Sequence, residues 1–475
     1  MQSLRSLRRG LVGVVALAAC LVATPVGTGV VSVHAAGSAT LAGGGEFHPL
    51  APTRIFDSRT YDGGPINDPA AGPKPITGVA STFNVNVLGQ GGIPTAPDQV
   101  LAIAVSVTVT APTSQGVLGA YAAGSAPATL TSVLNFNAGQ TVANMAILSP
   151  GTGGNITVAL FGGNGSAQVV VDVFGWFSTS SVAAGALSGS RLIPVAPGRI
   201  LDTRDDTNLP GRGRLPLAPG ESVDVPVRGV TSVSPTTPNL VPNSPTVVGV
   251  VLNVVGITDR PGGAPTYLSV TPDAVPAGTP PTTSNVNLPA GMIKSNLVIV
   301  PVGDDGKAHI YNYIGGGKTD VAVDVVGYMQ TVSDPTTYTG RVIPLSAPYR
   351  TFDTRDPNFG GAPLGPGVAE SWSFADFAAS VKIAGGTVGP QSAVIGNLTN
   401  ASLTRQYRTV PVLSYLTAWM GGQSRPMTSY INSNENPPAV ANMAILPYGP
   451  NNTVQFYNYA GNAHYLFDAS AVVLS

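Results

Sequence analysis

Short apolar runs separated by glycine- and proline-rich stretches recur along most of the chain. Two of the clearest are Val-Val-Val-Asp-Val at 169–173 and Val-Ala-Val-Asp-Val at 321–325. Runs of this length that are rich in β-branched residues and bounded by turn formers are typical of β-strands. The 58 glycines and 43 prolines also interrupt helices. The pattern predicts an all-β protein made of many short antiparallel strands.

One pattern occurs three times along the chain. Each copy opens with a strand of the form Arg-x-[Phe/Leu]-Asp-[Ser/Thr]-Arg and closes on an apolar strand that holds a single aspartate. Nearly equal separations between these landmarks indicate an internal repeat. The sequence therefore predicts three modules, each a β-sandwich with jelly-roll or Greek-key-like connections. Their expected bounds are 47–177, 191–330 and 341–475.

Two segments of small and polar residues, 178–190 and 331–339, join the copies. Segments of this composition behave as flexible spacers. We therefore expect the modules to stand in tandem, each with a core of its own, rather than to close into one three-bladed assembly.

The charged residues that recur in every copy lie on strands that are otherwise apolar. On the closing strand of the first copy, Val170, Asp172 and Phe174 share one face. A carboxylate between two large apolar side chains needs a partner to stay ionised, and the arginines of the opening strand are the obvious candidates. We expect an Arg–Asp contact between the first and last strands to close each module. The candidate residues are Arg54, Asp57, Arg59 and Asp172; Arg199, Asp202, Arg204 and Asp324; and Arg350, Asp353, Arg355 and Asp468.

Each recurring feature also has a functional interpretation beside the structural one. The charged residues would form a repeated ligand or cation site, although Ca²⁺ needs several carboxylates per site. Paired asparagines in the middle of each module would either form hydrogen bonds with backbone groups in turns or contact carbohydrate. Aromatic side chains would either pack in the core or form a platform for sugars or proteins. The asparagine pairs are Asn135/Asn137, Asn285/Asn287 and Asn432/Asn434, and the aromatic residues are Trp176, Tyr313, Trp372, Tyr415, Trp419 and Tyr457.

Composition narrows the classes of function. Only 10% of the residues are charged and the net charge is -1, which gives no electrostatic footprint for nucleic acid or an anionic membrane. After the first 35 residues, His48, His309 and His464 stand alone, and no Gly-x-Ser-x-Gly motif or zinc-ligand spacing occurs. The sequence therefore predicts a protein that is not an enzyme and that takes no metal or cofactor.

Residues 1–35 have the form of a signal peptide. Three arginines precede the apolar run 11–23, and small residues suit cleavage after Ala35. The alternative is a lipoprotein signal that ends at Cys20, the only cysteine, which would then carry the lipid anchor. No later stretch is long and apolar enough to predict a transmembrane helix. We expect a secreted protein that is extracellular or associated with the cell wall.

The opening Arg-x-x-Asp-Thr-Arg strand and the closing Val-Asp-Val-x-Gly-Tyr strand resemble the secreted repeat modules of actinobacterial-type cell-surface proteins. The third copy departs from this pattern, because Ser470 and Ala471 follow in its closing strand and no Gly–aromatic pair occurs there. The resemblance implies display at the cell surface without a defined biochemistry.

Together these observations predict a non-catalytic structural or adhesive protein of the cell envelope. An array of carbohydrate-binding modules for cell-wall or environmental glycans is the alternative. The expected partners are cell-wall polysaccharide or another surface protein, including a second copy of this chain.

Overall fold

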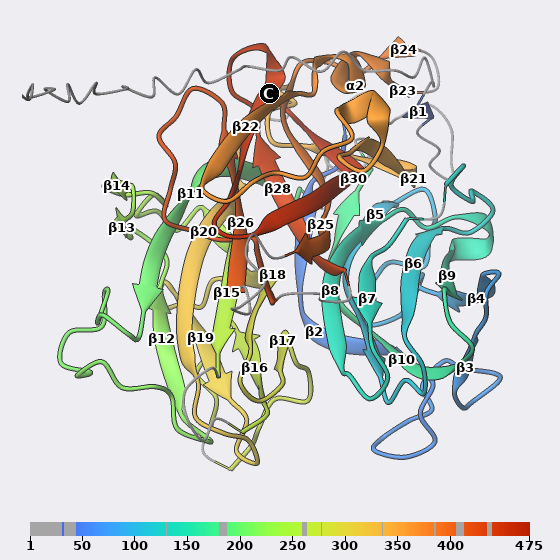
Figure 1. Ribbon diagram of the computed structural model, residues 1–475, viewed down its shortest axis with the longest axis horizontal. Coiled ribbons are helices and arrows are strands. Elements are labelled where there is room, and N and C mark those ends of the chain that lie inside the picture. The colour runs from blue at the N-terminus through green and yellow to red at the C-terminus, as the bar shows by residue number, and fades with distance from the viewer. Residues whose placement is uncertain are drawn as a thin grey trace, which may run out of the picture.

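Antiparallel β-sheets make up almost all of the regular structure. The computed structural model describes residues 31–32, 44–129, 131–179, 188–258, 264–276, 278–334, 336–383, 386–404, 413–434 and 439–475. Within these residues there is one short helix, α2 (Ala375–Ser380), and there are three 3₁₀ turns, η2 (Thr152–Gly154), η3 (Pro357–Phe359) and η4 (Pro450–Asn452). The prediction of an all-β fold with antiparallel sheets is confirmed (Figure 1).

Two four-stranded sheets pack face to face in the first sandwich. The inner sheet has the order β2-β10-β5-β8 and the outer sheet the order β4-β9-β6-β7. Counted along the chain, these strands are 1-8-3-6 and 2-7-4-5, which is the jelly-roll arrangement. The strands are β2 (Phe47–Asp57), β4 (Ser81–Asn86), β5 (Val100–Thr110), β6 (Gly116–Ala122), β7 (Leu134–Phe136), β8 (Val142–Leu148), β9 (Asn155–Phe161) and β10 (Gly165–Ser178), with the short β3 (Lys74–Ile76) beside β10.

The same strand order returns in the second sandwich, with inner strands β11-β20-β15-β18 and outer sheet β12-β19-β16-β17. Ser190 of β11 pairs with Phe47 of β2, so the inner strands of the first two sandwiches form one continuous sheet. These strands are β11 (Ser190–Asp202), β12 (Ser222–Pro226), β15 (Val247–Ile257), β16 (Thr266–Thr271), β17 (Val286–Leu288), β18 (Ile293–Pro301), β19 (Lys307–Asn312) and β20 (Asp320–Thr331). A small hairpin of β13 (Ser232–Val233) and β14 (Thr236–Thr237) lies between β12 and β15 in the chain.

The third sandwich has inner sheet β21-β30-β25-β28 and outer sheet β22-β29-β26-β27. Its strands are β21 (Val342–Asp353), β22 (Val368–Ser373), β25 (Gln391–Thr404), β26 (Leu413–Met420), β27 (Ile431–Asn434), β28 (Val440–Pro447), β29 (Thr453–Asn458) and β30 (Asn462–Leu474).

A third, small sheet beside this sandwich joins β23 (Val381–Ile383) to β24 (Gly386–Thr387) and, in parallel, to β1 (Val31–Ser32). Strand β1 falls within the predicted signal peptide, and the rest of that segment, with Cys20, lies outside the described residues.

Both faces of each inner sheet are buried. On β10, Val169, Val171 and Val173 pack into the core of the first sandwich. Phe174 and Phe177 belong instead to a cluster that draws residues from all three sandwiches. A sheet covered on both faces reads as an uninterrupted apolar run, which explains the continuous hydrophobic segment of β5.

The inner sheets face a common centre. Strands β8, β18 and β28, which occupy equivalent edges of the three inner sheets, lie against one another there, as the central positions of β8 and β18 in Figure 1 suggest. We call the line between them the central axis. The expectation that the linkers keep the sandwiches apart was wrong, because a shared cluster joins them around this axis. The expected separate cores are present in the first and second sandwiches.

Candidate functional site

An arginine of the opening strand contacts the aspartate of the closing strand in each sandwich. Arg54 Nε lies 3.0 Å from Asp172 Oδ1, and Arg350 Nε lies 2.8 Å from Asp468 Oδ1. Arg199 and Asp324 form the equivalent pair. The three aspartates are at most 2% exposed. Since the opening and closing strands are neighbours in each inner sheet, the contacts join the first strand of a sandwich to its last.

The second arginine of each opening motif binds the aspartate of its own strand rather than the closing aspartate. Arg59 Nη2 lies 2.7 Å from Asp57 Oδ2, and Arg54 Nη1 lies 3.3 Å from the same oxygen. The closing aspartate, the two arginines and the opening aspartate thus form one chain of contacts, which we call the clasp. The equivalent contacts of the second arginine join Arg204 to Asp202 and Arg355 to Asp353, both at 2.6 Å.

Burial and ion pairing act in opposite directions on the two aspartates of a clasp. Burial raises the pKa of Asp57, but hydrogen bonds from the side chain and backbone of Arg59 outweigh it, so the pKa is lowered. Burial is the larger effect at Asp172, where it outweighs the charge of Arg54 and raises the pKa. The same directions hold in the other two clasps.

The clasps lie where one sandwich meets the next. Arg54 Nη2 donates to the carbonyl of Thr282 in the second sandwich at 3.2 Å. Arg199 Nη2 lies 3.4 Å from the carbonyl of Met427 in the third sandwich. The clasps of the first two sandwiches therefore contribute to a junction as well as to their own sheets, and Asp468 of the third clasp lines a cavity together with residues of the first sandwich. We name the junctions first–second, second–third and third–first.

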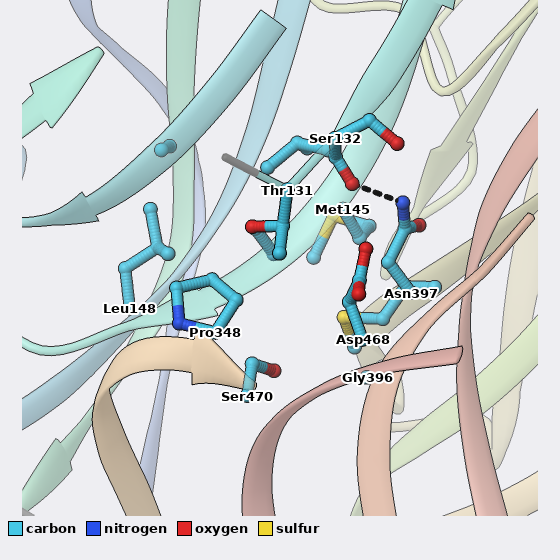
Figure 2. Close-up of a pocket in the computed structure, with 13 residues that line it drawn as sticks. Thr131, Ser132, Met145, Leu148, Pro348, Gly396, Asn397, Asp468 and Ser470 are labelled. Atoms are coloured by element: carbon cyan, nitrogen blue, oxygen red, sulfur yellow. Dashed lines mark hydrogen bonds between the residues drawn. The ribbon is translucent and has the colours of Figure 1, made fainter. Parts of the chain in front are cut away.

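Buried asparagines bridge two of these junctions. At the third–first junction, Asn144 Nδ2 donates to Asn397 Oδ1 at 2.9 Å, and Asn144 Oδ1 accepts from the backbone of Met443 at 3.0 Å. Asn397 in turn donates to the carbonyl of Ser132, and Figure 2 shows this contact beside Asp468 and a small cavity of about 20 Å³. Each amide thus bonds across the boundary between two sandwiches.

The second–third junction repeats the arrangement. Asn442 Nδ2 donates to Asn253 Oδ1 at 3.0 Å, and Asn442 Oδ1 accepts from the backbone of Leu297 at 2.9 Å. Asn253 donates to the carbonyl of Ser429 at 2.6 Å. The asparagine that accepts from its partner's amide pairs in register with the closing aspartate of a clasp: Asn253 with Asp324, and Asn397 with Asp468.

The first–second junction lacks this bridge. Ser106 pairs in register with Asp172 and so occupies the position of Asn253 and Asn397. Ser106 Oγ and Asn296 Oδ1, which at the other junctions correspond to an amide of the bridge and to the acceptor of a backbone N–H, are buried and have no hydrogen-bond partner among the described residues. Asn296 keeps only the bond within its own sandwich, from Nδ2 to the carbonyl of Asn285 at 2.6 Å.

A buried ion triad that the sequence did not reveal lies at the other end of the axis. Glu46 Oε1 lies 3.1 Å from Arg191 Nε and 3.0 Å from Arg341 Nη2. All three residues are at most 4% exposed. Glu46 and Arg341 come directly before β2 and β21, and Arg191 is the second residue of β11, so one carboxylate joins the starts of all three sandwiches. The repeat concealed the triad because its three members are of two residue types.

An open cleft of about 740 Å³ lies at the first–second junction. One wall carries Tyr267 and Tyr313, whose rings stack with centroids 4.4 Å apart. The other wall carries Arg54, Arg59 and Asp62. Burial, together with the neighbouring tyrosine hydroxyls, raises the pKa of Tyr267 to about 12. The phenol therefore stays protonated at physiological pH and can donate a hydrogen bond.

Most of the aromatic residues that the sequence singled out are packed rather than displayed. Trp176, Trp372, Trp419 and Tyr457 are at most 9% exposed. Tyr415 stacks on Tyr459 with centroids 4.8 Å apart, in the third-sandwich position equivalent to the Tyr267 pair. The first sandwich has Val117 and Phe161 at these positions, so only one of the two is aromatic there.

The expected absence of metal and catalytic clusters stays a prediction. No group of three or more His, Cys, Asp or Glu residues suited to a metal occurs in the part of the chain that the structure describes. His309 lies 3.1 Å from Asp224, and His464 lies 3.2 Å from the hydroxyl of Thr354. Within the described residues, no helix is long and apolar enough to cross a membrane.

Comparison with known proteins gives no family. No family model matches the chain, and no curated protein matches it. The similar solved structures include Sulfolobus turreted icosahedral virus, 8% identical over 90% of this chain and 92% of that chain, with a TM-score of 0.17. A tandem of carbohydrate-binding modules, CBM22-1-CBM22-2 of Paenibacillus barcinonensis Xyn10C, is 11% identical over 60% of this chain and 99% of that chain, with a TM-score of 0.16.

A third similar structure is described as the triple jelly-roll fold and turret assembly of an archaeal virus. It is 8% identical over 90% of this chain and 91% of that chain, with a TM-score of 0.15. Likenesses at TM-scores this low carry no argument. The jelly-roll description therefore rests on the strand order of this chain.

Proposed function

We propose that this chain is a non-catalytic, secreted protein of the cell envelope that adheres by binding glycans in the cleft at the first–second junction. The stacked pair of Tyr267 and Tyr313 in that cleft is the observation that carries the proposal. The signal-peptide pattern of residues 1–35 supports secretion.

The chemistry of the cleft suits a sugar ring. A pyranose presents an apolar face of C–H groups and a rim of hydroxyls, and an aromatic ring with a polar edge complements both. Tyr267 and Tyr313 are partly exposed in the cleft. Across from them, the ion pair of Arg59 and Asp62, 2.6 Å apart, offers donors and acceptors for sugar hydroxyls.

The clasps are better explained as structural elements than as three ligand sites. Their carboxylates are occupied by guanidinium groups of the same sandwich, and two of the arginines extend to the next sandwich. A protein held in this way presents the two walls of the cleft in a fixed relation, which lowers the entropic cost of binding a ligand between them.

Calorimetric titration of the secreted protein against a panel of neutral and acidic oligosaccharides tests the proposal. We expect at least one glycan to bind and Tyr267→Ala to weaken that binding by about tenfold or more, as loss of a central aromatic contact does. Tyr415→Ala is the matched control, since it removes the equivalent ring outside the cleft. Failure of the whole panel to bind, or equal losses in the two variants, would contradict the proposal.

A further inference from the structure

A second, smaller pocket lies on the central axis next to the cleft. All three sandwiches line it, at the starts of β8, β18 and β28, and its volume is about 50 Å³. Gln140, Thr141, Asn287 and Pro289 line both this pocket and the cleft, so the two adjoin. We call it the axial pocket.

The axial pocket is lined by polar groups without protein partners. The ammonium group of Lys294 makes no hydrogen bond or ion pair with any residue that the structure describes, and burial lowers its pKa. Asn285 and Asn296 are 1% and 3% exposed. The Nδ2 atoms of Asn285 and Asn287 and the Oδ1 atom of Asn296 are buried with no bond to a described residue. Buried polar groups are normally satisfied, so this many unpaired groups in one place need an explanation.

The polar character of the pocket belongs to the second sandwich alone. Asn144, Asn296 and Asn442 occupy equivalent positions in the three sandwiches. Lys294, two residues before Asn296, therefore occupies the position that Val142 and Val440 have in the other sandwiches. The carbonyl that accepts from the β18 asparagine belongs to Asn285, whereas the equivalent carbonyls belong to Val133 and Tyr430. Two apolar positions have thus become an ammonium and an amide where the axis meets the cleft.

We propose that the axial pocket binds a carboxylate, and that this carboxylate belongs to the glycan in the cleft, which is therefore acidic. The second part rests on the proposed function. No aspartate or glutamate stands among the described residues that line the pocket, so its only formal charge is the ammonium of Lys294. An anion beside it would offset the cost of burying that charge and would accept from the amides of Asn285 and Asn287.

The size of the pocket favours a carboxylate over a bulkier oxyanion. A site needs about 10–15 Å³ of this volume for each water-sized group, so 50 Å³ accommodates about three to five heavy atoms. The three heavy atoms of a carboxylate lie well within this range. Sulfate and phosphate have five heavy atoms each. The shared lining residues let a sugar ring lie against the tyrosines while its acidic group enters the pocket.

The test of the pocket itself uses acetate as the probe. The full secreted protein is titrated with sodium acetate, sodium sulfate or sodium chloride at constant ionic strength, and binding is followed through the side-chain NMR signal of Lys294 and through Tm. We expect acetate to shift the Lys294 signal and raise Tm more than chloride or sulfate does. We expect Lys294→Met to weaken acetate binding by about tenfold or more.

Control variants keep this test decisive. Lys318→Met removes an exposed lysine of the same sandwich and should leave acetate binding unchanged. Lys294→Val installs the residue that Val142 and Val440 supply elsewhere, so the variant is expected to fold. The NMR titration of the unaltered protein does not depend on either variant. Equal effects of acetate and chloride on that protein would overturn the carboxylate site, and a stronger effect of sulfate would overturn the preference for a carboxylate.

A competition experiment separates this inference from the proposed function. Oligogalacturonate and its methyl ester share one backbone and differ in charge. If the acid binds more tightly than the ester and acetate competes with it, the carboxylate enters the pocket as proposed. If glycans bind with no preference for acids, the proposed function stands and the acidic ligand is excluded. If acetate binds and no glycan does, the pocket serves a free carboxylate and the proposed function fails.

Discussion

The first–second junction differs from the other two in what it lacks and in what it has gained. Asparagine pairs cross the second–third and third–first junctions, whereas at the first–second junction Ser106 Oγ and Asn296 Oδ1 are each buried without a partner among the described residues. That same junction opens into the tyrosine-lined cleft and adjoins the axial pocket. The repeated contacts hold three similar jelly rolls around one axis. Departure from the repeat marks the place that we assign to ligand binding.

The clasp is the part that all three junctions share, and breaking it should have the largest effect. Asp324→Ala leaves the guanidinium of Arg199 buried with only one of its two carboxylates, Asp202, which should lower the free energy of unfolding by about 3–5 kcal/mol. Asp172→Ala should cost a similar amount, because the clasp is the same at the first–second junction. Urea denaturation measures both, with the surface variant Asp305→Ala as the control. A loss below about 1 kcal/mol in both clasp variants would show that the pair does not hold the fold.

The bridging asparagines distinguish an intact junction from the altered one. Asn442→Ala removes bonds to Asn253 and Leu297 and leaves buried groups unsatisfied, at about 1–3 kcal/mol for each. Asn296→Ala at the altered junction removes one bond, to Asn285. We therefore expect the first variant to be less stable than the second by about 1–3 kcal/mol. Equal losses would mean that the bridge across the junction contributes nothing.

Restoring the missing bridge at the first–second junction should raise the stability of the fold. Ser106→Asn places an amide where the other two sandwiches have one, within reach of Asn296. A recovered hydrogen bond should raise the free energy of unfolding by about 0.5–1.5 kcal/mol. Thermal unfolding of this variant and of Ser106→Ala measures the gain. A decrease in stability for Ser106→Asn would indicate that the first–second junction has no room for the bridge.

Acidification should change the stability of the fold less than any of these substitutions, because it acts on each clasp aspartate only in part. The pKa values of Asp57, Asp202 and Asp353 lie below the ordinary 3.8 in the folded protein, so the stability they contribute is complete above pH 3.8 and is lost as pH falls through the lowered values. The raised pKa values of the closing aspartates act oppositely above pH 3.8, where folded protein takes up protons first. These aspartates should therefore hold the urea midpoint or raise it slightly as pH falls towards 4, and lower it below pH 4. Burial lowers the pKa of His48, which costs stability below pH 6.5, so the measurement is made in a His48→Gln background. A steady decrease from pH 7 to 4 in that background would contradict these directions.

The sequence predicted the features that the three copies share. Strand type followed from apolar runs between turns, and the clasp residues were identified because every copy retains them. Parity along the strand left two arginines as candidates for each closing aspartate, and only the structure showed that Arg59 binds Asp57 instead. The assembly around one axis was missed, although the unbroken apolar run of β5 is typical of a sheet covered on both faces.

The features that differ between copies could not be predicted from the repeat. The asparagine motif equates Asn285 with Asn135, but the strand register places Asn287 at that position, because Asn287 pairs with Tyr267 as Asn135 pairs with Val117. Only that register shows that Asn285 replaces an apolar residue. The triad around Glu46 joins chain positions far apart, and no local pattern connects a glutamate to two arginines in later copies.

Amide hydrogen exchange of the secreted protein, with and without a bound glycan, tests most directly whether ligand binding is confined to the first–second junction. The account predicts protection at 138–141, 265–267 and 282–289, which line the cleft. It predicts no change around Tyr415 and Tyr459, which form the equivalent pair in the third sandwich. Equal protection of the second and third sandwiches would contradict the assignment of ligand binding to one altered junction.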